Sequence, residues 1–157
     1  MDKCTSNSRL PSLKGLVVLT QTDTSVGFIS QNVDRLIEIK SRPSTKPFIE
    51  FFQDFKTALA CEIRIPKRFK ARVRRSKKTT FIVKNRAFRV AKLSLHSAIL
   101  RDLSWHYSTS ANESGKHYEA TFCEEKADII IHNHDGLYEA PSSRLYKIGK
   151  KRARRLR

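Results

Sequence analysis

The stretch KSRPSTKP, Lys40 to Pro47, holds three cations and two prolines and contains no acidic residue. A helix is predicted before it, with Ser30 or Asn32 as the cap. Pro43 ends that helix, because the residue before a proline is driven out of the helical region. The following stretch, PFIEFF (Pro47 to Phe52), is typical of a strand. The chain therefore passes from a helix to a strand through a stiff basic loop.

The other elements follow from short β-branched runs, alternation and capping residues. Strands are predicted at residues 13–22, 79–84, 87–93, 105–110, 127–132 and 141–148, and helices from Asp54, from Pro66 and from His96. In the basic helix after Pro66, Phe69 and Val73 lie one turn apart and anchor it while its cations point outward. Strands alternate with helices, so we expect an α/β domain with a mixed sheet.

Length and composition narrow the class of protein. A chain of 157 residues with 39% hydrophobic residues is typical of one globular domain. The apolar runs are far shorter than the roughly 20 residues that a membrane span needs. The polar start has no apolar signal core, so we expect a cytoplasmic protein. Three widely spaced cysteines fit reduced thiols better than disulfides.

The net charge of +17 is concentrated in two segments. Arg64 to Lys78 holds nine Lys or Arg, and Lys147 to Arg157 holds seven, in both cases without an acid. Subtracting these 16 from the 32 cations leaves 16 against 15 acids, so the rest of the chain is nearly neutral. Such clusters suit a polyanion such as RNA or a polyphosphate. A solvated basic face with a loose tail is the alternative.

The basic loop also suggests a phosphate site. Two prolines restrict its backbone, so it loses little entropy on ordering around a ligand. Arg42 can grip phosphate oxygens with a planar fork, and Lys40 and Lys46 supply point charges. The competing interpretation is a basic turn that complements the dipole of the preceding helix.

Two hydroxyl-rich turns follow predicted strands. They are TQTDTSVGF, Thr20 to Phe28, and YSTSANESG, Tyr107 to Gly115. Ligands of α/β sheets dock at strand ends, where such small donors and acceptors are useful. Either turn alone is also consistent with an ordinary polar connection.

Six blocks together carry a family resemblance. They are Thr22 to Phe28, the pattern K-x-R-P-x-x-K-P at Lys40 to Pro47, Thr80, Arg89-Val90-Ala91, the complete S-T-S-A-N-x-S-G at Ser108 to Gly115, and Pro141-Ser142-Ser143. In this order the chain resembles the YrdC/YciO family of threonylcarbamoyl-AMP synthases. Phe51 stands where that family often has a histidine. The resemblance covers nearly all of the chain.

The resemblance implies a YrdC-like α/β fold, a twisted mixed sheet with flanking helices and an open basic concave cleft. It implies one short domain over residues 1–148, with a polar N-terminal segment at 1–12 and a basic tail at 149–157.

The implied activity is a nucleotidyltransferase. Such enzymes join L-threonine, bicarbonate and ATP into threonylcarbamoyl-AMP and pyrophosphate, for the threonylcarbamoyladenosine modification of tRNA. By position in the motifs, the ATP-binding residues are Lys40, Arg42, Lys46, Thr80 and Asn112, with Lys40 and Arg42 as catalytic residues and Mg²⁺ on the phosphates. The threonine-binding residues are Thr24, Arg89, Ser110 and Ser142. A further ATP-contacting arginine is expected within Arg152 to Arg157.

The alternative function is a YciO-like protein with little or no catalysis that binds double-stranded RNA or tRNA. Its predicted RNA-binding residues are Arg68, Arg72, Arg75, Lys78 and Arg154. Partner proteins of tRNA modification are compatible with either function. The stretch HNHD, His132 to Asp135, is more typical of a solvated turn than of a metal corner, so no metal site is predicted.

Overall fold

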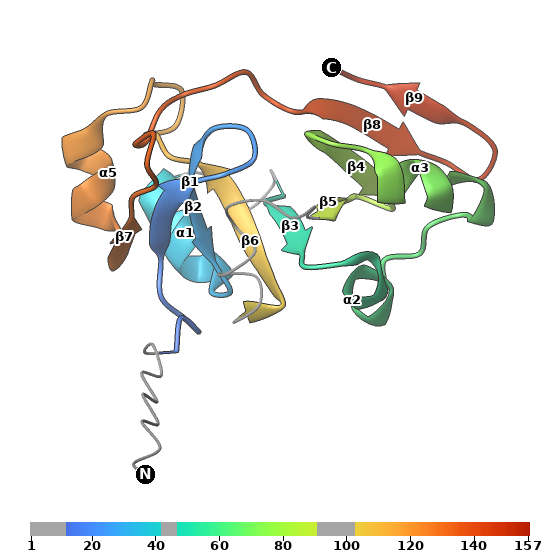
Figure 1. Cartoon of the computed structure of the whole chain (residues 1–157), viewed down its shortest axis with the longest axis horizontal. Helices are drawn as coiled ribbons and strands as arrows, with labels where there is room; N and C mark the ends of the chain where they lie inside the picture. The colour runs from blue at the N-terminus through green and yellow to red at the C-terminus, as the bar shows by residue number, and fades with distance from the viewer. Residues whose placement is uncertain (1–11, 42–46, 91–102) are drawn as a thin grey trace, which may run out of the picture.

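A computed structural model describes residues 12–41, 47–90 and 103–157. Their strands form a single sheet of nine in the order β7-β1-β2-β6-β3-β5-β4-β8-β9 (Figure 1). The strands are β1 (Val18–Gln21), β2 (Val26–Ser30), β3 (Ile49–Phe52), β4 (Thr79–Val83), β5 (Arg86–Val90), β6 (Trp105–Ser110), β7 (Ile129–Ile131), β8 (Arg144–Ile148) and β9 (Ala153–Arg155). The helices are α1 (Val33–Lys40), α2 (Phe55–Ala60), the 3₁₀ turn η1 (Lys67–Phe69), α3 (Lys70–Arg75) and α5 (Ala120–Lys126).

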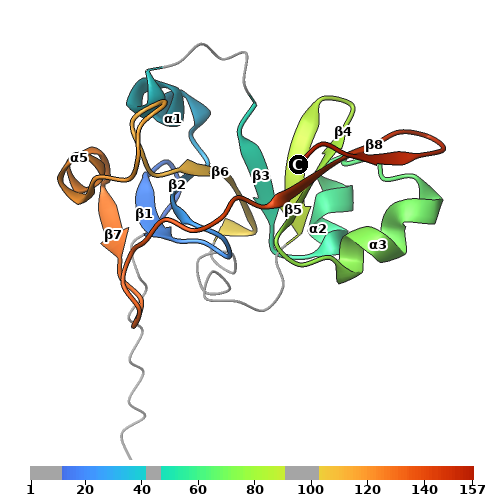
Figure 2. The ribbon, with the colours of Figure 1, turned by 90° about the horizontal axis from the view of Figure 1, so that it is seen from above.

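The sheet is mixed, as predicted. Strands β1/β7, β3/β5 and β4/β8 pair in parallel, and the other five pairs are antiparallel. Helices α1 and α5 lie near the end of the sheet that contains β1 and β7, and α2 and α3 lie near the end that contains β4 and β8 (Figure 2). The domain therefore has two ends, each with its own helices.

Capping residues explain where two helices begin. The side chain of Asn32 accepts hydrogen bonds from the backbone N–H groups of Asp34 and Arg35, and so caps α1. Asp54 caps α2 by accepting from the N–H of Thr57 at 2.7 Å, and this hydrogen bond lowers the pKa of Asp54. The α1 helix and the helix from Asp54 confirm the sequence predictions. The predicted helix from His96 begins outside the described residues.

Several predicted boundaries were wrong. The first strand begins at Val18 and not at Leu13, and the strand β2 was not predicted at all. The five residues of β2 are all buried and include Gly27 and Ser30, so they lack the alternation of a half-exposed strand. The basic segment from Lys147 onward contains β9, which pairs with β8.

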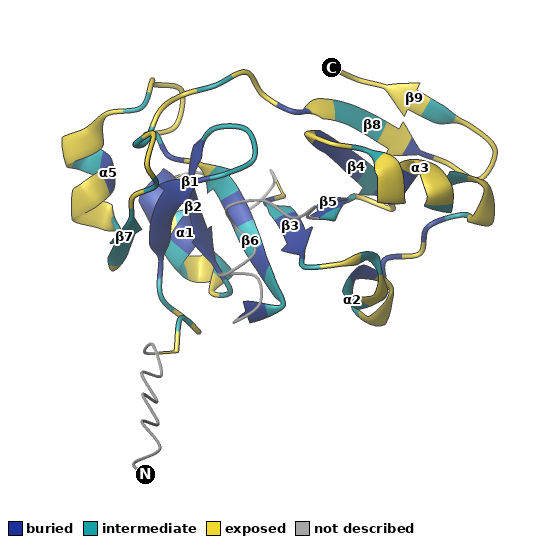
Figure 3. Ribbon diagram, viewed as in Figure 1, coloured by how far each residue is buried: buried dark blue, intermediate teal, exposed yellow. Residues whose placement is uncertain are grey.

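Alternation along the paired strands divides the sheet into two faces. On the helix-covered face, Phe28, Phe52, Phe81 and Phe88 are buried against the helices in two apolar clusters. Their strand neighbours, among them Phe51 and Arg89, point to the other face. We call this second face the open face. Burial is deepest in the central strands and least along α5 and the β8–β9 edge (Figure 3).

Gly27 is predicted to be essential for close packing of β2 on β6. A Cβ atom there would lie 2.9 Å from the backbone oxygen of Thr109 and 3.0 Å from Cγ2 of Thr22. Gly27→Ala should therefore lower the free energy of unfolding by about 1–3 kcal/mol, measured by urea denaturation.

The control is Gly149→Ala, because its Cβ would make an ordinary contact of 3.5 Å with Arg152. Equal stability of Gly27→Ala and the wild type would contradict the close approach of the two strands.

Candidate functional site

A cavity of about 680 Å³ opens on the open face of the sheet. Four segments supply its polar lining: the β1–β2 connection, β5, the end of β6 with the loop after it, and the segment before β8. The polar side chains that line it include Thr22, Thr24, Ser25, Arg89, Ser108, Ser110, Asn112, Glu139, Ser142, Ser143 and Arg157. The volume is in the range of small-molecule sites. The two hydroxyl-rich turns predicted to follow strands thus meet in one place.

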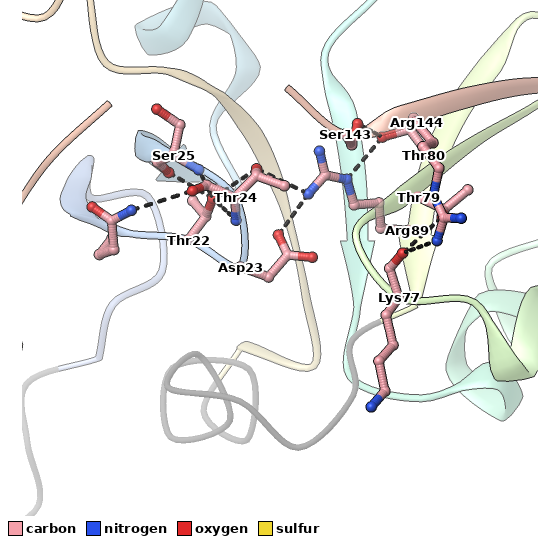
Figure 4. Close-up of polar contacts among 11 residues, drawn as sticks. Thr22, Asp23, Thr24, Ser25, Lys77, Thr79, Thr80, Arg89, Ser143 and Arg144 are labelled. Carbon is pink, nitrogen blue, oxygen red and sulfur yellow. Dashed lines mark hydrogen bonds and ion pairs between the residues drawn. The ribbon is translucent and has the colours of Figure 1, made fainter. Parts of the chain in front are cut away.

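Arg89 is the buried cation of this cavity, with only 5% of its surface exposed. Its Nε donates to Oγ1 of Thr80 at 2.8 Å. Its Nη1 donates to Oδ1 of Asp23 at 2.5 Å and to Oγ1 of Thr24 at 3.2 Å (Figure 4). Phe51 packs against the guanidinium at 5.1 Å from the ring centre. These contacts fix the guanidinium in one orientation at the cavity wall.

Arg89 is ion-paired with Asp23, and a second cation, Arg157, lies close enough to affect it. Burial lowers the pKa of Arg89, and the nearby charge of Asp23 raises it. The charge of Arg157 acts in the same direction as burial, because two cations near one another disfavour protonation. Asp23 does not line the cavity. The cavity lining therefore holds two arginines and one acidic residue, Glu139, and the excess of positive charge suits an anionic ligand.

Thr80 is buried behind Arg89. Its hydroxyl contacts Oγ of Ser143 at 2.8 Å and accepts the hydrogen bond from Arg89. Thr80 does not line the cavity, whereas the nucleotide role predicted for it needs direct contact. Its observed contacts are those of a residue that supports Arg89.

Lys40 is buried at the end of α1, with 2% of its surface exposed. Its ammonium donates to the backbone oxygens of Ser110 and Asn112 at 2.9 and 2.6 Å, and to Oδ1 of Asn112 at 2.7 Å. These contacts tie α1 to the loop after β6. Arg42 and Lys46, the other cations of the predicted phosphate loop, lie outside the described residues.

Asn112 is held on both sides of its amide group. Its Oδ1 also accepts from Oγ of Ser110 at 2.7 Å, and its Nδ2 donates to the backbone oxygen of Lys116. Asn112 lines the cavity as the nucleotide prediction requires. Its side-chain hydrogen bonds, however, are all made to the protein, with Lys40, Ser110 and Lys116, and they hold the loop after β6 in place.

The four predicted threonine-binding residues come together. Thr24, Arg89, Ser110 and Ser142 all line the cavity, although they derive from four separate parts of the chain. Asp23, the partner of Arg89, was not predicted as a site residue. The hydrogen bond between Thr80 and Ser143 was not predicted either, and neither contact has a local sequence signal.

Two charged residues at the rim were also not singled out. Arg157 lines the cavity, and its Nε donates to the backbone oxygen of Ser143 at 3.2 Å. It belongs to the range Arg152 to Arg157, in which an ATP-contacting arginine was expected. Glu139 accepts from the N–H of Tyr118 at 2.6 Å and lies 3.1 Å from Nδ1 of His117. The acidic Glu139 links two loops that border the cavity.

The predicted RNA-binding residues do not all share one face. Arg68, Arg72 and Arg75 are exposed residues of η1 and α3, on the helix-covered face, and exposed Lys78 precedes β4. Arg154 in β9 pairs with Lys147 in β8. The neighbouring pair, Ile148 and Ala153, packs under the helices. Because side chains alternate along a strand, Arg154 and Lys147 point to the open face.

The described residues contain no group of three or more His, Cys, Asp or Glu able to hold a metal ion. The side chains of His134 and Asp135 in the HNHD stretch are solvent-exposed. Within the same residues, no helix has the length and apolar character needed to cross a membrane.

Comparisons with solved structures show the fold. P. abyssi Sua5 complexed with L-threonine matches with TM-score 0.73 and 21% identity, over 91% of this chain and 50% of that chain. E. coli YciO matches with TM-score 0.71 and 18% identity, over 91% of this chain and 82% of that chain. T. kodakarensis HypF matches with TM-score 0.73 and 12% identity, over 91% and 22%.

The chain spans about half the length of the P. abyssi Sua5 chain. Comparison with curated protein sequences gave no significant match. The Sua5/YciO/YrdC family model, described as telomere recombination, matches residues 13–151, which is most of the chain. The chain therefore belongs to the Sua5/YciO/YrdC family.

Proposed function

We propose that the chain is a nucleotidyltransferase that forms threonylcarbamoyl-AMP and pyrophosphate from L-threonine, bicarbonate and ATP. The observation that carries the proposal is the meeting of Arg89 with three hydroxyl side chains, those of Thr24, Ser110 and Ser142, in one cavity. The similar fold of P. abyssi Sua5, a structure complexed with L-threonine, supports an amino acid as the ligand.

Arg89 would receive the carboxylate of threonine. Its Nε and Nη1 already have acceptors in Thr80, Asp23 and Thr24, so its position is set before the ligand arrives. A preorganised guanidinium loses little entropy on binding an anion. The hydroxyls of Ser110 and Ser142 would hydrogen-bond the rest of the amino acid.

The proposed reaction needs no protein nucleophile. The threonine amine takes up the carbon of bicarbonate with loss of water and forms a carbamate. A carbamate oxygen then attacks the α-phosphorus of ATP, and the bond from that phosphorus to the bridging oxygen of pyrophosphate breaks. The protein must hold several anions together and stabilise charge on the phosphoryl group, so positioning and fixed cations supply the catalysis.

The cations for the phosphates would be Arg157 in the cavity wall and Arg42 and Lys46 from the basic loop. Lys40 would act through its hold on the Ser110–Asn112 loop, because its ammonium is occupied by three oxygens of that loop. Magnesium would be carried by ATP, since hard cations of this kind are commonly bound through substrate phosphates.

A second candidate function is binding of double-stranded RNA or tRNA with little catalysis. The specific observation in its favour is that no acidic residue occurs between Glu62 and Asp102 or after Glu139. The two candidates differ in their dependence on threonine, which the next experiment measures.

Release of pyrophosphate from ATP is expected only when threonine and bicarbonate are both present. The physical reason is that the attacking group, a carbamate, forms from the two together. The measurement is an enzyme-coupled pyrophosphate assay, with labelled bicarbonate to follow the adenylated product. ATP turnover that ignores threonine would reject the proposed reaction.

Arg89→Lys is expected to weaken threonine binding by about 10- to 100-fold, because charge-assisted hydrogen bonds contribute about 1.5–3 kcal/mol. Lysine keeps the charge but lacks the planar fork, in which separate nitrogens point to Thr80, to Asp23 and to a ligand. The apparent KM for ATP should change much less than that for threonine.

The matched control is Arg86→Lys. Arg86 lies on the same strand, but its side chain is on the opposite face, where it pairs with Glu50 at 2.6 Å. Its replacement should reduce thermal stability and leave the KM for threonine unchanged. If both variants raised the KM equally, the assignment of Arg89 as the carboxylate receptor would be wrong.

A further inference from the structure

The carboxylate of Asp23 and the cavity share one guanidinium, that of Arg89. Asp23 belongs to the β1–β2 connection, and its Oδ1 accepts from Nη1 of Arg89 at 2.5 Å. Asp23 does not line the cavity, whereas Arg89 does. Nε is bonded to Thr80, so Nη2 is the one guanidinium nitrogen without an acceptor among the described residues (Figure 4). A ligand that reaches Nη2 from the cavity therefore lies next to the negative charge of Asp23.

The position of Asp23 is set by the turn that carries it. Oγ1 of Thr22 accepts from the backbone N–H groups of Thr24 and Ser25, both at 3.2 Å. The same hydroxyl donates to the backbone oxygen of Ser25 at 2.6 Å. These contacts close the turn around Asp23 without using its carboxylate. The negative charge is therefore held beside Arg89 before any ligand arrives.

Asp23 offsets the excess positive charge of the cavity lining. Among the described residues that line the cavity, Arg89 and Arg157 are the cations and Glu139 is the acid. Asp23 adds a second negative charge from behind the lining, so these four formal charges cancel. A site of this kind suits a ligand that is neutral overall. A free amino acid is such a ligand, because it brings one carboxylate and one ammonium group.

The proposed reaction brings two anionic groups into this cavity, the carboxylate of threonine and the phosphates of ATP. An arginine fork suits the oxygens of both groups, so Arg89 by itself does not distinguish them. Arg157, to which we assign the phosphates, is near enough for its charge to lower the pKa of Arg89. A phosphate at Arg157 is therefore attracted by Arg89 as well. Keeping the two anions apart requires a repulsive element in addition to attractive ones.

We propose that Asp23 excludes phosphate groups from Arg89 and so reserves this guanidinium for the single carboxylate of an amino acid. The proposal rests on the proposed function, from which it takes the two ligands. A carboxylate carries one negative charge, whereas a terminal phosphate group carries about 1.5 to 2. The repulsion from Asp23 is therefore greater for the phosphate. Asp23 acts through Arg89, as a positioning residue that touches neither ligand.

The test compares three single variants with the wild type. Asp23→Asn removes the charge and keeps the size of the side chain and one of its oxygens, and Asp23→Glu keeps the charge. Asp135→Asn removes one negative charge from an exposed side chain outside the cavity lining, so it controls for the change in net charge. Thermal unfolding checks that each variant remains folded.

The probe is inorganic phosphate at slightly alkaline pH. The binding of L-threonine is titrated by calorimetry at rising phosphate concentrations, with the ionic strength kept constant by sodium chloride. In Asp23→Asn, phosphate should compete at a concentration roughly 10- to 100-fold lower than in the wild type, because one unit charge at close range changes binding by about that factor. Asp23→Glu and Asp135→Asn should resist phosphate as the wild type does. A merely structural role of Asp23 would lower stability without a gain in phosphate affinity.

Three results would overturn the proposal. They are unchanged phosphate competition in Asp23→Asn, an equal gain in Asp135→Asn, and phosphate sensitivity of Asp23→Glu, in which the charge is intact. Adding Arg89→Gln to Asp23→Asn should remove the gained phosphate affinity, and persistence of the gain would also reject the proposal, because the phosphate would then lie elsewhere.

Direct titration of phosphate into the wild type and into Asp23→Asn gives a readout that needs no threonine. It separates the failure of this inference from the failure of the proposed function. A wild type that does not bind threonine would count against the proposed reaction. Equal phosphate affinities of these two proteins would count against the role of Asp23.

Discussion

The two-residue alternation of side chains across one continuous sheet is the constraint on which the rest of this structure depends. Because every strand is paired, the face of each side chain is set by its partners from β1 to β9. One face is covered by helices and contains the phenylalanine clusters. The other face carries Arg89 and the cavity. A shift of one residue in β5 would exchange Phe88 and Arg89, and so would lose both the core and the site.

Two buried cations couple this sheet to its loops. A charge removed from water is costly unless it is paired and hydrogen-bonded. Lys40 meets this requirement with oxygens of the loop after β6, and Arg89 meets it with Asp23 and Thr80. Asp23 and the oxygens that bind Lys40 come from distant parts of the chain, whereas Thr80 lies nine residues from Arg89 on the adjacent strand β4. The loops around the cavity are therefore positioned by the same contacts that compensate the buried charges.

The two faces also separate two kinds of ligand chemistry. The cavity on the open face has a volume and a set of hydroxyl groups suited to a small anionic molecule. On the helix-covered face, Val73 and Phe69 pack inward against the sheet. Arg68 and Arg72 remain exposed on the outer side of the same helical segment, so that the surface there is cationic. An amphipathic helix on a sheet edge thus contributes both to stability and to a charged surface.

Local signals in the sequence were sufficient for the cap Asp54, the strand from Trp105 and the class of the fold, and they narrowed the cap of α1 to Ser30 or Asn32, of which the structure shows Asn32. The ordered motifs also named residues that meet in the cavity, such as Ser110. Caps and periodicity depend on neighbours within a few residues, so one sequence contains them. Only the tertiary structure decided the pairing of Asp23 with Arg89, 66 residues away, the strand β9, and the division of the basic tail between two faces. Register and charge pairing arise from contacts between distant segments, and such contacts leave no local pattern.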